Sequence, residues 1–306
     1  MQSATNLKRK LRLPREGMVE TLNTGEKILQ TLIILVVVLV AFSSLIPLYH
    51  VVMASFSDGK SLLAHSGILW TPEGKATLEG YKNLFKDASL LKGYMNTLIY
   101  VFGATFFCMF INITGGYVIS RDTKLKGFLT VFIMLTAMFS GGLIPTYMVV
   151  RSLGWVGNRW SLLIPGCTNA FFVVMMVAAY RDVPKETIEA ARMDGANHWR
   201  VMWDVMLPQA MSIGTVIIMN SVLLQWNSWF NAAIYIPTKR DLWPLQLWIR
   251  QIVADNAGFL MSANPDYSRY LVQYALIVVA TMPVLLVMPF FAEKMEKNVV
   301  VGAVKG

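Results

Sequence analysis

Amide and aromatic side chains gather in the second half of one long apolar stretch of the sequence. They are Asn220, Gln225, Asn227, Trp229 and Asn231. The spacing of Asn220, Asn227 and Asn231 would place all three on one face of a single helix. Amides hydrogen-bond to sugar hydroxyls and aromatic rings stack on sugar faces, so this chemistry suits a carbohydrate. The set predicts a substrate path, for which Asn112 in an earlier apolar stretch is a weaker candidate.

The same residues also have two plainer interpretations. Amides within a membrane join one helix to another by hydrogen bonds. Trp and Tyr side chains gather where a bilayer meets water. The residue pattern by itself leaves a substrate path, helix-to-helix bonding and an interfacial belt all open.

Residues typical of catalysis or metal binding are scattered along the sequence. His50, His65 and His198 lack the spacing of metal ligands. A Gly-Lys-Ser sequence at residues 59–61 matches the end of a phosphate-binding loop, but Ala54 stands where that loop needs a glycine. No HExxH or GxSxG motif occurs. We therefore expect no catalytic residue, no metal site and no cofactor bound by this chain.

The composition indicates which elements carry these residues. Of the 306 residues, 55% are hydrophobic and 15% are charged, whereas a soluble domain usually has about 25% charged residues. The net charge of +9 would suggest nucleic acid for a soluble protein. Here the basic residues lie between apolar runs, which favours orientation in a bilayer and no nucleic-acid partner. A helix of about 20 apolar residues crosses the hydrocarbon core, so we predict an all-α polytopic membrane protein with about six transmembrane helices.

The predicted spans are Ile28–Met53, Tyr94–Ser120, Phe128–Val150, Ser161–Tyr180, Ala210–Ile236 and Leu271–Ala292. Gly141, Gly142 and Pro145 predict a break in the third span. Charged residues are nearly absent from these spans, which argues against a proton-driven pump.

The basic residues between the spans predict the orientation of the chain. Several precede the first span, and Arg121, Lys124 and Lys126 crowd the link between the second and third. Since Lys and Arg favour the cytoplasmic side, both termini are expected there. The prediction has a cytoplasmic segment at 1–27, a transmembrane domain at 28–292 and a cytoplasmic tail at 293–306. Segments 54–93 and 237–270 are then outside, and LWPLQLWIRQIV in the second predicts a short amphipathic helix.

A charged segment, residues 181–208, separates the fourth and fifth predicted spans on the cytoplasmic side. Asp182 is a candidate N-cap and Pro184 suits a first helical turn. Gly195 predicts a turn between two short helices, and Pro208 marks the start of the fifth span. The segment is too charged for the lipid core, and a helix of this kind often lies on the bilayer surface.

The same segment carries a motif. Glu189-Ala190-Ala191, then Gly195, Val205 and Leu207-Pro208 resemble the EAA loop of binding-protein-dependent (type I) ATP-binding-cassette importer permeases, with Val205 where the family has Ile. The resemblance implies a coupling helix that docks in a cleft on an ATPase subunit. Glu189 would pair with a basic group there. The implied ATPase-coupling residues are Glu189, Ala190, Ala191, Asp194, Gly195, Leu207 and Pro208.

The resemblance extends over about residues 90–292, the permease domain core. Residues 140–165, LWPLQLWIR and the C-terminal VVVGAVKG are similar to the carbohydrate branch of the family, including maltose-type and oligosaccharide-type permeases. It implies import of a carbohydrate across a bacterial cell membrane. The implied partners are a second permease in a heterodimer, two ATPase subunits that hold ATP and Mg²⁺, an extracytoplasmic solute-binding protein and membrane lipid. The tail at 293–306 either reaches the ATPase or is solvated.

Two other functions stay open at this point. The cargo of such a permease could be a solute other than a sugar. A secondary transporter or channel would act without ATP, but it predicts inverted repeats and intramembrane charges that the sequence does not clearly show.

Overall fold

The computed structural model describes residues 24–259 and 267–303. These divide into two units, one ending at His50 and one beginning at Val51, and each is considered by itself. The first unit is the greater part of helix α2, Thr24–Ser55. Almost every residue of α2 before His50 is exposed, and its apolar length exceeds what a bilayer core requires. The predicted first span is therefore a helix whose surroundings must themselves be apolar.

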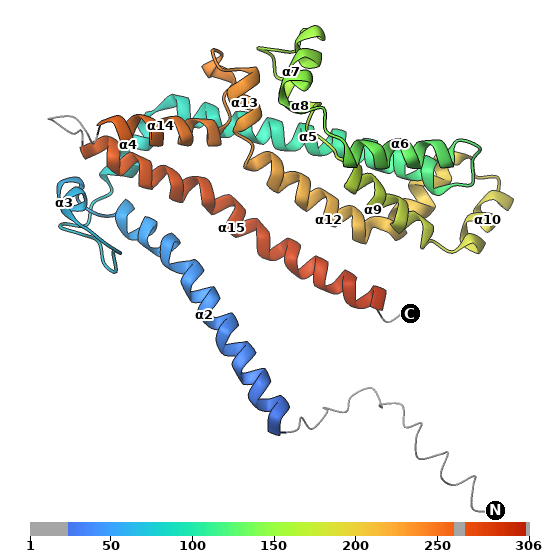
Figure 1. Ribbon diagram of the computed structural model, residues 1–306, viewed down its shortest axis with the longest axis horizontal. Helices are drawn as coiled ribbons and strands as arrows, with labels where there is room; N and C mark the ends of the chain where they lie inside the picture. Colours follow the sequence, from blue (N-terminus) through green and yellow to red (C-terminus); the bar gives the residue numbers. More distant parts are fainter. Residues whose placement is uncertain (1–23, 260–266, 304–306) are drawn as a thin grey trace, which may run out of the picture. The chain divides into compact units, whose positions relative to one another are not determined.

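The second unit is helical throughout its described part, without a strand. Its order along the chain can be followed in Figure 1. Its helices are α3 Gly59–Ala64, α4 Glu79–Lys86, α5 Ala88–Ser120, α6 Lys126–Met138, α7 Leu143–Ser152, α8 Trp160–Leu163, α9 Ala170–Arg181, α10 Lys185–Met193, α11 His198–Arg200, a π-helical turn Val201–Met206, α12 Leu207–Trp226, α13 Phe230–Tyr235, a 3₁₀ turn Arg240–Leu242, α14 Leu245–Phe259 and α15 Tyr267–Ala303. The all-α prediction is confirmed.

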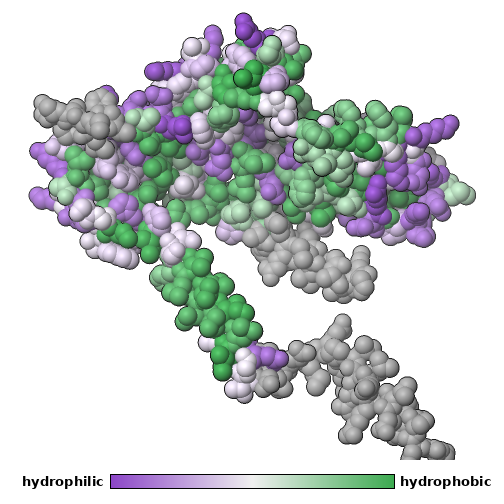
Figure 2. Space-filling model, in the orientation of Figure 1, coloured by the Kyte–Doolittle hydropathy of each residue, from purple (hydrophilic) through white to green (hydrophobic). Residues whose placement is uncertain are grey.

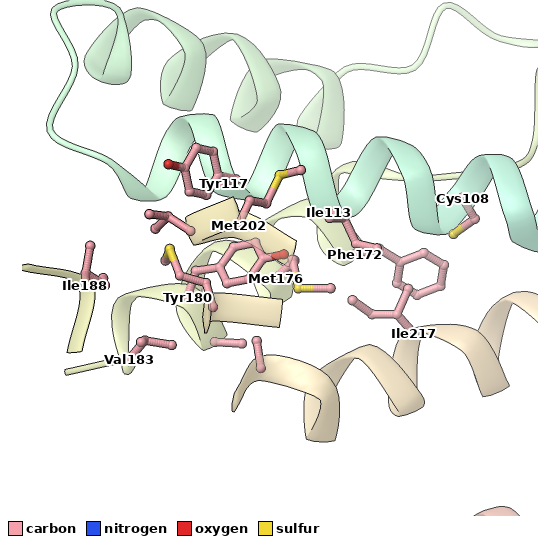
Figure 3. Packing of buried hydrophobic residues seen from close by; sticks show 14 residues of the cluster. Cys108, Ile113, Tyr117, Phe172, Met176, Tyr180, Val183, Ile188, Met202 and Ile217 are labelled. Atoms are coloured by element: carbon pink, nitrogen blue, oxygen red, sulfur yellow. The ribbon is translucent and has the colours of Figure 1, made fainter. Parts of the chain in front are cut away.

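The core of this unit forms where α5 packs against α9 and α12. Its largest cluster is drawn in Figure 3, in which Tyr117, Met176, Tyr180 and Met202 lie close together. The approach of α5 to α9 depends on Gly116, because a Cβ atom there would lie 2.7 Å from Cγ of Met176. Small residues let membrane helices approach in this way. On its other side α12 meets α15, which also packs on α4 and α14.

Broken helices distinguish the observed spans from the predicted ones. The predicted break in the third span is confirmed, since α6 and α7 meet at an angle of 118° and Gly142 between them has φ +81°. The prediction of an unbroken helix over Ser161–Tyr180 is wrong. The chain leaves α8 before Pro165, which cannot donate a helical hydrogen bond, and α9 begins only after Asn169 caps it by accepting from the backbone N–H of Phe172 at 3.0 Å.

The prediction of an unbroken helix over Ala210–Ile236 is also wrong. Helix α12 ends at Trp226 and α13 begins at Phe230. By length and composition the described residues hold four helices able to cross a bilayer, together with the bent pair α6–α7 and the shorter apolar helix α9. The 12 residues of α9 extend about 18 Å, so this helix needs α8 and the connecting residues to cover the remaining depth.

Candidate coupling segment and substrate path

The charged segment folds into the predicted helix, glycine turn and second helix. The N-cap prediction for Asp182 is wrong: Asp182 is the C-cap of α9, and Pro184 occupies the N-cap of α10. The cause is local, because α9 continues to Arg181 and leaves only a short connection before Lys185. Within α10 only Ile188 is buried, at 5% exposure, and it joins the α5–α9–α12 cluster. Ile188, with the half-buried Ala191 on the same helix, thus attaches a mostly exposed helix to the bundle.

The turn after α10 is a Schellman motif. Gly195 adopts φ +81°, its N–H donates to the carbonyl of Arg192 at 3.0 Å, and the N–H of Ala196 donates to the carbonyl of Ala191 at 3.0 Å. A left-handed residue at this place is usually glycine because it carries no Cβ. Asn197 then caps α11 by accepting from the N–H of Arg200 at 2.9 Å. The turn therefore holds α10 and α11 in one defined arrangement.

The second helix runs into α12 without interruption, as one helix over His198–Trp226. The predicted start of a separate span at Pro208 is therefore wrong. Pro208 has no N–H, and its ring would collide with the carbonyl of Asp204 in a regular α-helix. The chain widens into a π-helical turn at Val201–Met206, just before this proline. Val201, Met202 and Met206 are buried, which fixes this turn in the core.

The motif residues differ in exposure. Glu189, Ala190, Asp194, Gly195 and Pro208 are exposed, while Ala191 and Leu207 are half-buried. Glu189 makes no ion pair with any residue in the described part of the chain. One face of α10 is therefore free to meet another surface, and the other face is held by Ile188.

One residue pair escaped the sequence analysis. The hydroxyl of Tyr117 in α5 lies 2.9 Å from Nδ1 of His198, the first residue of α11, and the two rings meet edge to face. This hydrogen bond connects the charged segment directly to a long apolar helix. Neither residue type predicts the other, because they lie far apart in the sequence.

The amide residues of the predicted substrate path do not share one helical face, since α12 ends before Asn227 and Asn231 lies on α13. Asn220 and Asn227 donate to the carbonyls of Val216 and Leu223 on the preceding turn, both at 2.9 Å. Asn220, Trp229 and Asn231 are half-buried, and Asn227 is exposed.

Gln225 and Asn112 are buried, at 8% and 0% exposure. Gln225 donates to the carbonyl of Gly166 at 3.1 Å, and Asn112 donates to Oγ1 of Thr168 at 2.9 Å. Both partners lie in the break between α8 and α9, so these two amides bond to the segment that connects those helices.

Trp229 has a neighbour that the sequence did not point to. The guanidinium of Arg250 in α14 lies 3.7 Å from the centre of its ring, within the range of a cation–π contact. Among the described residues, no group of three or more His, Cys, Asp or Glu side chains could hold a metal ion.

The fold and the charged segment together define a helical membrane subunit of a transport system. Residues 88–301 match the family described as "Binding-protein-dependent transport system inner membrane component", and the chain belongs to that family. It is 29% identical over 272 residues to the polygalacturonan/rhamnogalacturonan transport system permease protein YtcP of Bacillus subtilis, covering 87% of this chain and 94% of the relative. It is 27% identical over 266 residues to the diacetylchitobiose uptake system permease protein NgcG of Streptomyces coelicolor, covering 84% and 83%.

A solved structure has the same fold. It is a crystal structure of a bacterial ABC transporter involved in the import of the acidic polysaccharide alginate. The TM-score is 0.80 at 24% sequence identity, and the match covers 89% of this chain and 98% of that one. The chain is thus a multi-pass membrane permease of a binding-protein-dependent transport system.

Proposed function

We propose that this permease moves a carbohydrate, and specifically an oligosaccharide, into the cell by alternating access. The names of its relatives support the cargo class, since YtcP is described for pectic polysaccharides and NgcG for diacetylchitobiose. The observation that carries the coupling half of the proposal is α10, a helix with an exposed motif face and a single buried anchor, Ile188.

Coupling would proceed through α10. Its exposed face, with Glu189 and Ala190, enters a cleft on an ATPase subunit, where Glu189 meets a basic group. The Schellman turn at Gly195 and the buried π-helical turn then transmit the displacement to α12, and the bond between His198 and Tyr117 transmits it to α5. A packed bundle responds to such a displacement by moving whole helices rather than by deforming.

The complex we propose contains this chain, a second homologous permease, two ATPase subunits and an extracytoplasmic solute-binding protein. ATP and Mg²⁺ bind in the ATPase subunits, and this chain binds no cofactor. Both termini lie in the cytoplasm of a bacterial cell. ATP binding closes the ATPases on the two coupling segments, and hydrolysis returns the complex to its resting state.

In the substrate path we assign different tasks to the two groups of amides. Asn220, Asn227 and Asn231, with the ring of Trp229, offer hydrogen bonds and an apolar face to a sugar. Gln225 and Asn112 hold the α8–α9 break in place behind them. The carbonyls that now accept from Asn220 and Asn227 lie in their own helix, so either amide can turn to a ligand without disturbing the fold.

Reconstitution tests this function. The chain is co-expressed with its partner permease, ATPase subunits and binding protein, and the complex is placed in proteoliposomes containing ATP. We expect uptake and ATP hydrolysis to rise when the binding protein carries a neutral or acidic oligosaccharide. Vesicles with ADP instead of ATP are the control. Uptake that continues with ADP contradicts ATP coupling, and a response only to amino acids, peptides or ions contradicts the cargo class.

A further inference from the structure

A basic cavity of about 570 Å³ lies at the end of the bundle where α10 is attached. It is lined by the turn between α5 and α6, the end of α9, and α10. Its charged lining residues are five basic ones, Arg121, Lys126, Arg181, Lys185 and Arg192, and two acidic ones, Asp122 and Glu189. Basic side chains outnumber acidic ones, and in the described chain only Lys126 is paired, with Asp122 at 2.7 Å. The cavity therefore carries uncompensated positive charge.

The pKa of Asp122 reflects the same positive charge. Lys126 donates a hydrogen bond to this carboxylate, and together with Lys185 and Arg121 it lowers the pKa of Asp122 below its usual value. The two carboxylates, Asp122 and Glu189, face five cationic side chains, so the cavity still attracts an anion.

An apolar groove of about 110 Å³ continues from this cavity between α6 and α9. Its apolar lining residues include Ile119, Ile133, Met134, Val173, Val177 and Ala178. Arg181 lines both the groove and the basic cavity. Figure 2 shows the hydrophilic surface around α10 beside the hydrophobic surface of α6.

Three helices each contribute to both parts. Helix α5 gives Ile119 to the groove and its C-cap Arg121 to the cavity. Helix α6 contributes Lys126 to the cavity, and its first groove-lining residue lies about one turn further along. Helix α9 contributes Val177 to the groove, and its cavity-lining residues lie about one turn further along. No residue of α6 is fully buried. Ile133 is half-buried against Val173 and Val177, whereas Met134, which also lines the groove, is exposed.

We propose that the cavity and groove form one binding site for an anionic phospholipid. The phosphate lies among Arg121, Arg181 and Lys185, and one acyl chain lies along α6 and α9. Basic pockets between membrane helices bind anionic lipid headgroups in this way. The continuity with the apolar groove favours a lipid over a free phosphate ion, because a free ion needs no groove. It also favours a lipid over an acidic side chain of another protein for the same reason.

Native mass spectrometry of the full-length chain tests the site by titration with phosphatidylglycerol, phosphatidylcholine and inorganic phosphate. Arg121→Gln combined with Arg181→Gln empties the cavity of two charges. Ala178→Trp fills the groove from an exposed position outside the core. Arg151→Gln, an exposed arginine in α7 that lines neither part, is the matched control. Thermal unfolding of each variant reports whether it is folded.

We expect the wild-type chain to bind phosphatidylglycerol at least about tenfold more tightly than phosphatidylcholine. The double arginine variant should bind phosphatidylglycerol about 30-fold more weakly while its binding of phosphatidylcholine is unchanged. Ala178→Trp should weaken both lipids, and Arg151→Gln neither.

Three outcomes would overturn the assignment. Equal binding of both lipids removes the anionic site. Full competition by inorganic phosphate, with no effect of Ala178→Trp, identifies a free-anion site instead. Unchanged lipid binding in the double arginine variant, with loss of the ATPase subunits from the purified complex, assigns these arginines to a protein partner.

Discussion

The hydroxyl of Tyr117 and Nδ1 of His198 lie 2.9 Å apart, and this contact joins the last turns of α5 to the helix that follows the Gly195 turn. Tyr117 also meets Tyr180 of α9 edge to face, with ring centroids 6.5 Å apart. Tyr117 therefore connects three parts of the molecule that must move together if α10 drives the bundle: α5, α9 and the start of α11.

A double-mutant cycle measures this connection. Tyr117→Phe keeps the ring and removes the hydroxyl, and His198→Phe removes the nitrogen. Each change should cost about 1 kcal/mol of folding stability, and the two together should cost less than their sum because they share one hydrogen bond. Thermal unfolding of the purified chain gives the stabilities, and ATP-driven uptake should fall in both single variants.

Tyr147→Phe is the matched control for that cycle. Its ring stacks on Tyr235 with centroids 6.1 Å apart, in the separate cluster around α13. It should leave uptake unchanged. Strict additivity of Tyr117→Phe and His198→Phe would show that the hydrogen bond contributes nothing.

Two adjacent glycines test the packing of α5 on α9. A Cβ at Gly116 would lie 2.7 Å from Cγ of Met176, whereas a Cβ at Gly115 would meet nothing nearer than Val173 at 4.0 Å. Gly116→Ala should therefore lower the free energy of unfolding by about 1–3 kcal/mol through overpacking. Gly115→Ala should be neutral or slightly stabilising, since Ala favours a helix over Gly. Thermal unfolding of both variants under identical conditions decides the matter, and equal melting temperatures would contradict the observed packing.

The sequence predicted those features of the fold that depend on local chemistry. Apolar runs gave the helical class, Gly142 gave the break between α6 and α7, and Gly195 gave the turn after α10. Each follows from hydropathy or from the backbone freedom of one residue.

The breaks that the sequence missed depend on contacts between distant residues. The α8–α9 break is stabilised by Gln225, which donates to the carbonyl of Gly166 at 3.1 Å, and by Asn112, which donates to Thr168 at 2.9 Å. The chain near α13 is held similarly, since the N–H of Gly157 donates to the carbonyl of Tyr235 at 2.8 Å. Interrupted helices are tolerated at membrane depth only when such partners satisfy the freed backbone groups. Hydropathy within one run carries no information about these partners.

In the candidate site, too, the sequence predicted local features and missed contacts between distant residues. The motif predicted α10 and its exposed face, but the hydrogen bond between Tyr117 and His198 and the cation–π contact of Arg250 with Trp229 arise only when distant segments pack. The predicted shared face of Asn220, Asn227 and Asn231 failed because it assumed one helix where the chain turns after Trp226.

The proposed docking of α10 predicts the effect of reversing one charge. Glu189→Lys should turn an attraction to a basic group on the ATPase into a repulsion, weakening that association by about 30-fold or more. Co-purification of ATPase subunits with the tagged chain measures it, and ATP-driven uptake should fall in parallel.

Glu186→Lys is the matched control for this reversal. Glu186 is exposed on the same helix, outside the motif. If this variant loses as many ATPase subunits as Glu189→Lys does, the net charge of the segment explains the loss and Glu189 has no specific role. Full retention of the subunits by Glu189→Lys would contradict docking through this residue.

The turn at Gly195 predicts a loss of transport efficiency that is caused by backbone strain alone. A Cβ at Gly195 would meet nothing within 4 Å, so Gly195→Ala adds no clash, but it forces an alanine to φ +81° at a cost of about 1–2 kcal/mol. The Schellman bonds should weaken, α10 should no longer be held rigidly to α11, and the sugar taken up per ATP hydrolysed should fall.

Gly195→Asn should restore part of that ratio, because Asn adopts positive φ more readily than Ala. Gly127→Ala in α6 is the control, since it also adds a methyl into open space but at a residue without positive φ. An unchanged transport ratio in Gly195→Ala would mean that motion reaches α12 without a rigid turn.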